Sequence, residues 1–186
     1  VADYVLQHTP GNTVSNLSST RGLRDVTEKY GCNYTPAAVG EVNVVSKMKE
    51  TGAVIGGEGN GGVIYPAAHS GRDALVGIAL ILTHLAKLGC KTSELRDSLP
   101  QYYISKNRID LEPKTDIFSL LQKIKDIYKE QQVTDIDGVK IDFPDKWVHL
   151  RKSNTEPIIR VYAEAHTREE ADALAQQLVD LAYSMI

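Results

Sequence analysis

The chain has 186 residues, 42% hydrophobic and 24% charged, which is enough for one large domain or two small ones with a substantial core. The formal net charge is −3 and the pI is about 6.0, which argues against a nucleic-acid-binding surface. No apolar run reaches the length of a membrane span and no signal peptide is recognisable, so we expect a cytoplasmic protein with no membrane partner. Cys32 and Cys90 follow no metal-binding or redox-motif spacing and are expected to be reduced core thiols.

Strand and helix patterns alternate through the first hundred residues, which predicts a layered α/β domain over residues 1–104. The first residue is Val1, and residues 1–8 resemble the end of a helix stopped by Pro10-Gly11. We therefore expect the chain to be a fragment of a longer protein. Strands are predicted at 12–18, 32–35, 53–55 and 63–65, and helices at 18–30, 40–50, 75–89 and 93–99.

A second domain is predicted over residues 105–186. Its elements follow the order strand, helix, three strands, helix, with a hairpin turn at Asp137-Gly138 and a capping box formed by Thr167 and Glu170 before the last helix. This order predicts an α+β domain with a four-stranded antiparallel sheet and two helices on one face.

A glycine-rich segment lies between two strand patterns, with five glycines among residues 56–62. It fits the pattern G-x-G-x-x-G, but the residues that follow are not helical, so the dinucleotide-binding context is missing. What remains is a loop, expected to span residues 56–62, that presents the carboxylate of Glu58 and the amide of Asn60. These two groups suit sugar hydroxyls, because a carboxylate accepts from neighbouring O–H groups and an amide both donates and accepts. The alternative is a glycine-rich turn that binds no ligand.

Three polar residues after this loop are predicted to begin the long helix. His69 could transfer protons near neutral pH, although an isolated histidine is more often a surface or capping residue. Arg72 at a helix N-terminus would be unfavourable with respect to the helix dipole, which hints at an anionic partner. Asp73 is interpreted as a helix-start residue, and the role of Glu41 stays open.

The segment from Arg151 to Arg160 has the composition of a phosphate-binding loop. Two arginines flank Ser153, Asn154 and Thr155, and Pro157 closes the turn. Guanidinium groups form forked hydrogen bonds to phosphate oxygens, and the N–H groups of a turn can line an anion site. If residues 152–157 connect a hairpin, Arg151 lies near Ile158, and Arg160 shares the face of Ile158. The alternative is a charged hairpin on a solvated surface.

Together the two loops resemble the α-D-phosphohexomutases. Residues 57–61, Gly-Glu-Gly-Asn-Gly, match the sugar-recognition loop of the third domain of that family. Residues 151–157 match the family's phosphate loop, Arg-x-Ser-x-Thr-Glu-Pro, in the fourth domain. Many members carry His as the sixth residue of the sugar loop, where this chain has Gly62, so His69 is our candidate for the catalytic proton-transfer residue.

The resemblance implies that the parent protein interconverts hexose 6-phosphate and hexose 1-phosphate through a phosphoserine enzyme and a bisphosphorylated sugar. Its N-terminal domains would carry the serine and a Mg²⁺ site, so we expect no metal in this chain and no activity from it alone. The sugar would be bound by Glu58, Gly59, Asn60, Gly61 and Arg72, and the non-reacting phosphate by Arg151, Ser153, Asn154, Thr155 and Arg160. Both loops would face one cleft. One alternative is a non-catalytic sugar-phosphate-binding module. Another is a dinucleotide-dependent oxidoreductase, which the missing helix after the glycine-rich segment argues against.

Overall fold

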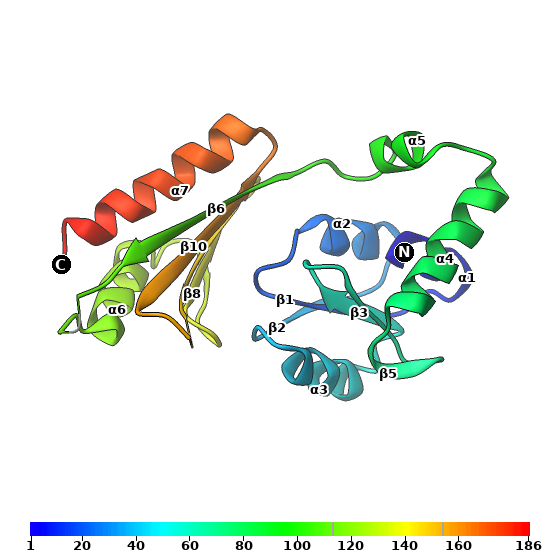
Figure 1. Cartoon of the computed structure of the whole chain (residues 1–186), viewed down its shortest axis with the longest axis horizontal. Coiled ribbons are helices and arrows are strands. Elements are labelled where there is room, and N and C mark those ends of the chain that lie inside the picture. The colour runs from blue at the N-terminus through cyan, green and yellow to red at the C-terminus, as the bar shows by residue number, and fades with distance from the viewer. Residues whose placement is uncertain (113, 154) are drawn as a thin grey trace. The chain divides into compact units, whose positions relative to one another are not determined.

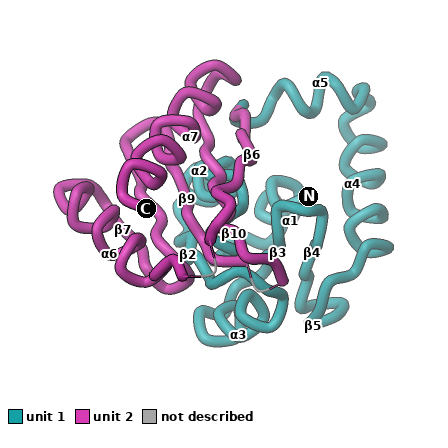
Figure 2. Tube along the Cα trace, turned by 60° about the vertical axis from the view of Figure 1, so that its left-hand side comes forward, with its two compact units in different colours: residues 1–101 teal, residues 102–186 magenta. Residues whose placement is uncertain are grey.

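The computed structural model describes residues 1–112, 114–153 and 155–186. The chain divides into two compact units, Val1–Gln101 and Tyr102–Ile186 (Figure 2). Within the described residues, no helix is both long enough and apolar enough to cross a membrane.

The first unit is an α/β domain built on a five-stranded mixed sheet. Its strand order is β2-β1-β3-β4-β5, in which β1 pairs parallel with β2 and β3 while β3, β4 and β5 pair antiparallel. The strands are β1 (Thr13–Asn16), β2 (Tyr34–Ala37), β3 (Ile55–Glu58), β4 (Gly62–Tyr65) and β5 (His69–Arg72). The helices are α1 (Ala2–His8), α2 (Gly22–Lys29), α3 (Glu41–Thr51), α4 (Ala74–Leu88) and α5 (Thr92–Asp97).

Helices cover both faces of this sheet, with α2 and α3 on opposite sides (Figure 1). On one face, Val44 and Met48 of α3 pack against Val14 and Ile64. On the other, apolar side chains of α1, α2 and α4 pack against Ile55 and its neighbours. This two-sided burial explains why the β1 positions are all buried, as a central parallel strand requires.

Two expectations for the first unit are wrong in detail. The glycine segment is a tight β-hairpin rather than a seven-residue loop, because β3 runs on to Glu58 and β4 already begins at Gly62. His69 and Arg72 do not begin the long helix; they form β5, which pairs with β4. The helix begins after Asp73, whose side chain accepts a hydrogen bond from Val76 N at 3.0 Å. The dipole argument for Arg72 therefore does not apply.

Helix α4 exposes much of its apolar stripe. Leu75, Ile78 and Leu82 are 78%, 52% and 58% exposed, whereas Gly77 and His84 are buried. The stripe that reveals the helix in the sequence is therefore not the surface by which α4 packs onto the domain.

The second unit is an antiparallel sheet with two helices. Its strand order is β6-β10-β9-β8-β7, with antiparallel pairing throughout. The strands are β6 (Tyr103–Asp110), β7 (Gln132–Thr134), β8 (Val139–Asp142), β9 (Trp147–Lys152) and β10 (Ile158–Ala165). The helices are α6 (Ile117–Ile127) and α7 (Arg168–Tyr183), which lie on the same side of the sheet (Figure 1).

The predicted α+β architecture is confirmed, but the sheet has five strands rather than four. The additional strand is β7, a three-residue edge strand that completes the Asp137-Gly138 hairpin with β8. The capping box of Thr167 and Glu170 is present at the start of α7. One core joins the two helices to the sheet, and Ile159, Val161 and Ala163 of β10 point into it. Alternate residues of β10, including Arg160, therefore lie on the opposite face.

Candidate functional site

The glycine hairpin between β3 and β4 owes its tight geometry to two glycines. Gly61 has φ +93°, and its N–H closes the turn onto the Glu58 carbonyl at 3.1 Å. A Cβ on Gly57 would lie 2.1 Å from the backbone oxygen of Gly62. Because Gly57 has no side chain, the two strands can approach closely enough to place Glu58 at the tip of the hairpin.

The Glu58 carboxylate is buried and is held at both of its oxygens. Its side chain is 6% exposed. Oε1 accepts a hydrogen bond from Asn16 Nδ2 at 2.9 Å, and Oε2 lies 3.3 Å from Arg72 Nη1. A carboxylate has about four lone-pair positions, so acceptor positions remain after these two contacts.

Arg72 is in turn held by Glu41, the first residue of α3. Arg72 Nε donates to Glu41 Oε2 at 2.9 Å, and the Arg72 backbone N–H donates to Glu41 Oε1 at 2.8 Å. These bonds, the backbone one first, hold the pKa of Glu41 below its ordinary value. Glu41, whose role the sequence left open, therefore fixes the guanidinium that reaches Glu58.

A second support comes from the segment that follows β1. Gly59 N donates to Ser19 Oγ at 2.8 Å, and Ser19 Oγ donates to Asn16 Oδ1 at 2.8 Å. Asn60 Oδ1 accepts from Gly62 N at 3.2 Å, so this carbonyl is turned into the hairpin. Sequence reasoning missed Asn16 and Ser19, although their position at or just after the end of a buried strand was a usable signal.

The site lies where an open α/β sheet normally binds its ligand. Asn16 and Glu58 end the adjacent parallel strands β1 and β3. The chain leaves β1 for β2 on one side and later enters β3 on the other side of β1. The carboxyl ends of strands at such a reversal form the usual binding crevice.

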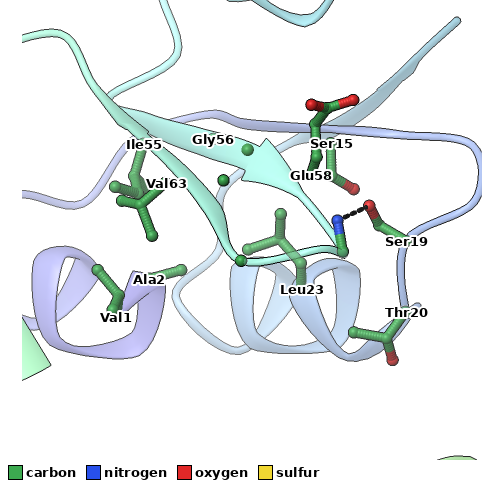
Figure 3. A pocket seen from close by; sticks show the side chains of 14 residues that line it. Val1, Ala2, Ser15, Ser19, Thr20, Leu23, Ile55, Gly56, Glu58 and Val63 are labelled. Carbon is green, nitrogen blue, oxygen red and sulfur yellow. Dashed lines mark hydrogen bonds between the residues drawn. The ribbon is translucent and has the colours of Figure 1, made fainter. Parts of the chain in front are cut away.

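A cavity of about 320 Å³ adjoins the hairpin and has mainly apolar walls. Figure 3 shows Val1, Ala2 and Leu23 on one side of the hairpin, with the Glu58 carboxylate directed away from them. The same view shows the hydrogen bond from the hairpin to Ser19. Glu58, Gly59 and Ser19 also line part of this cavity, so the polar network lies at the edge of the apolar space.

His69 lies on β5, three residues before Arg72, and is exposed. A Cβ on Gly71 would lie 2.8 Å from His69 Cε1 and 3.0 Å from Glu41 Oε1, so this glycine leaves room for both side chains. His69 is thus near the Glu41–Arg72 pair, and its proton-transfer role stays a prediction.

The phosphate-type loop joins β9 to β10 and brings its two arginines together directly. Arg151 is the direct cross-strand partner of Arg160. The sequence pattern predicts Arg151 near Ile158 instead, which is two residues earlier on β10. Arg160 Nη2 pairs with Glu156 Oε2 at 3.0 Å, and Arg151 Nε lies 3.8 Å from Asp137 Oδ2. Directly opposed residues share one face of the sheet, so both guanidiniums can reach one ligand.

The hydroxyl groups of Ser153 and Thr155 lie 3.4 Å apart in this loop. Ser153 is buried, and its N–H donates to the Ile158 carbonyl at 2.9 Å. Thr155 N donates to Ser153 Oγ at 3.4 Å. Asn154, the remaining predicted phosphate contact, lies outside the described residues.

Metal ligands do not gather in the described part of the chain, where no group of three or more His, Cys, Asp or Glu side chains could hold an ion. The location of a Mg²⁺ site in the parent protein stays a prediction.

Comparison with known proteins identifies the family of the chain. Residues 1–103 match the family profile described as phosphoglucomutase/phosphomannomutase, alpha/beta/alpha domain III. Residues 108–181 match that family's C-terminal domain. The chain belongs to the phosphoglucomutase/phosphomannomutase family. The predicted resemblance is therefore confirmed, and both polar loops lie within matched domains.

Relatives of this chain include proteins named as mutases. A phosphoglucosamine/phosphogalactosamine mutase of Sulfurisphaera tokodaii is 37% identical over 167 residues, covering 89% of this chain and 37% of the relative. A phosphoglucomutase/phosphomannomutase of Thermococcus kodakarensis is 37% identical over 174 residues, covering 92% of this chain and 38% of the relative. The crystal structure of a phosphoglucomutase/phosphomannomutase family protein from Burkholderia thailandensis superposes with a TM-score of 0.79 at 27% identity, covering 97% of this chain and 39% of that one. The chain thus spans about two fifths of the length of these proteins.

Proposed function

We propose that this chain is the substrate-binding half of a phosphohexomutase. The family interconverts sugar phosphates, and the chain matches two of its domains. In the proposed parent reaction, a phosphoserine enzyme converts hexose 6-phosphate to hexose 1-phosphate through a bisphosphorylated sugar. The observation that carries the proposal is the buried Glu58 carboxylate, held at both oxygens at the reversal point of the sheet.

The hairpin is assigned to the sugar hydroxyls. Glu58 has acceptor positions left after its contacts with Asn16 and Arg72, and hydroxyl groups are donors that fit them. Gly59 and Gly61 allow the sugar to approach the backbone, because neither has a side chain in the way. Asn60 and Arg72 border the same hairpin and complete the proposed hydroxyl site.

The loop between β9 and β10 is assigned to the phosphate that does not react. Arg151 and Arg160 share one face and provide forked donors, and Ser153 and Thr155 add hydroxyls beside them. Asn154 is proposed to join them. A bisphosphorylated intermediate must turn over between the two half-reactions, so one anchor has to serve both orientations of the sugar. Positioning of this kind is a major part of phosphoryl-transfer catalysis.

The remaining chemistry is assigned to parts of the parent protein outside this chain. The reactive serine and Mg²⁺ would belong to its N-terminal domains, and the bound ion would stabilise charge on the transferring phosphoryl group. Within this chain, His69 is the proposed proton-transfer residue near the sugar. The chain by itself is expected to bind hexose phosphate without turning it over.

Titration of the chain with glucose 1-phosphate or glucosamine 1-phosphate, followed by amide NMR shifts, tests this assignment. We expect shifts at residues 57–61 and 151–160. Inorganic phosphate should affect only the second group, and methyl glucoside only the first. Shifts confined to other regions with all four compounds would refute the assignment of both loops.

A pair of matched variants sharpens the phosphate test. Arg151→Ala is expected to lose on the order of 2–5 kcal/mol of binding free energy, because it removes one charged partner of the phosphate. Arg168→Ala removes the same charge at an exposed position on α7 and should bind as the wild type does. Equal affinity in the two variants would contradict the role of Arg151.

A further inference from the structure

A third arginine extends the Arg151–Arg160 pair across the sheet. Arg108 on β6 is the direct cross-strand partner of Arg160, which in turn is opposite Arg151. One row of three guanidiniums therefore crosses the three adjacent strands β6, β10 and β9. Ile109, the next residue of β6, points into the helix-covered core, so Arg108 lies on the other face with Arg160.

A surface cavity of about 460 Å³ lies along β6 and β10. The residues that line it are Lys106, Asn107, Arg108, Glu156, Ile158, Arg160 and Tyr162. The lining has three cationic side chains and one carboxylate, so its net charge matches a phosphate dianion. Lys106 lies over the ring of Tyr162, with Nζ 5.5 Å from the centroid, which places a second cation of β6 beside this space.

The row of like charges is unfavourable for the empty sheet. Directly opposed like charges destabilise a strand pair. Each arginine has a nearby carboxylate, and Arg108 Nε lies 3.3 Å from Asp110 Oδ1. That pair is 62% and 67% exposed, and exposed ion pairs compensate such a cost only weakly. An anion that bridges the guanidiniums would relieve the repulsion, whereas a purely structural role gives no reason for the row.

We propose that Arg108 is a further phosphate-binding residue, so that the phosphate site spans three strands with Lys106 at its edge. The ligand is the same phosphoryl dianion that the loop is proposed to bind, and the inference rests on that proposed function. Arg108 would meet the phosphate from the side opposite Arg151, with Arg160 between them. The motif in the loop cannot reveal this residue, because Arg108 lies more than forty positions upstream of Arg151.

Isothermal titration at low salt, with inorganic phosphate and with glucose 1-phosphate, tests Arg108 in the 186-residue chain. We expect Arg108→Gln to weaken the binding of both ligands about tenfold, which is at the lower end of the effect of losing one charge-assisted hydrogen bond. Arg108→Lys should recover part of the affinity because it keeps the charge. Arg168→Gln, a charge-matched change on α7, should leave the affinity unchanged.

Melting temperature without ligand separates binding from structure. Arg108→Gln should melt at the wild-type temperature or above it, because it removes repulsion, and phosphate should raise its melting temperature less than that of the wild type. If Arg108→Gln binds as Arg168→Gln does while Arg151→Ala loses affinity, the inference is overturned and the proposed function stands. If the wild type binds neither ligand, both are overturned. A lowered melting temperature, with equal affinity in Arg108→Gln and Arg108→Lys, would show a structural role and also overturn the inference.

Discussion

Gly57→Ala should disrupt the hairpin that presents Glu58, and the structure sets the size of the effect. The new Cβ would lie 2.1 Å from the Gly62 carbonyl oxygen and 3.4 Å from the Val63 Cα. Both are backbone atoms of the paired strand, so neither can rotate away. Overpacking costs about 1–3 kcal/mol where side chains can adjust, so we expect about 3 kcal/mol here.

Gly61→Ala in the same hairpin is the matched control. A Cβ at Gly61 meets nothing within 4 Å, but the residue has φ +93°. Its cost is therefore only that of a left-handed backbone conformation, about 1–2 kcal/mol. Gly57 also has a positive φ, +156°, so both variants carry backbone strain, and the difference between them reports mainly the contact with the opposite strand.

Urea denaturation with two probes measures both costs in the intact chain. The one tryptophan, Trp147, is buried in the second unit, so its fluorescence reports that unit, while circular dichroism reports both. Gly57→Ala should shift the circular-dichroism transition to lower urea and leave the fluorescence transition unchanged. It should also weaken hexose phosphate binding without affecting inorganic phosphate. A Gly57→Ala chain as stable as Gly61→Ala would refute the tight strand approach at Gly57.

Three further outcomes are expected. Glu41→Gln should weaken the binding of hexose phosphate but not of inorganic phosphate in NMR titrations, because it releases Arg72 from its position beside Glu58. Burial lowers the pKa of His149 to about 4 from 6.5, so the unfolded state binds the proton first as the pH falls. Trp147-detected stability should therefore drop by roughly 3 kcal/mol between pH 6.5 and pH 4, and His149→Gln should flatten this dependence. Leu150→Ala, in the core, should cost about 2–5 kcal/mol in denaturant unfolding, whereas Leu82→Ala, 58% exposed on α4, should cost less than about 0.5 kcal/mol.

Local signals in the sequence were sufficient for much of the fold. The capping box at Thr167 and the Asp137-Gly138 turn fix chain directions through contacts within a few residues, and both are present in the structure. Strand β5 was missed because His69-Ser-Gly-Arg72 has no apolar alternation. Its conformation comes from pairing with β4, a tertiary contact that a window of residues does not contain.

In the candidate site, too, local motifs were recognised and residues that act through tertiary contacts were missed. Glu58 and Arg151 were identified because each lies in a motif whose residue types match a ligand chemistry. Asn16 and Glu41 were not, because they reach Glu58 and Arg72 from forty-two and thirty-one positions away. The expected pairing of Arg151 with Ile158 was two residues out of register, since the turn geometry that sets register was unknown.

The two loops differ in the ligand chemistry that each of them favours. Around the hairpin, Glu58 and Glu41 carry two negative charges against the one positive charge of Arg72, so a phosphate would be repelled there while neutral hydroxyl donors would not. Around the β9–β10 loop, the three cationic side chains of Arg151, Lys152 and Arg160 outnumber the two carboxylates of Asp137 and Glu156. A ring that carries hydroxyl groups therefore suits the hairpin, and a phosphoryl group suits the loop. Exchanging the ring hydroxyls for hydrogens should therefore reduce the contribution of the first site alone, and removing the phosphate that of the second alone.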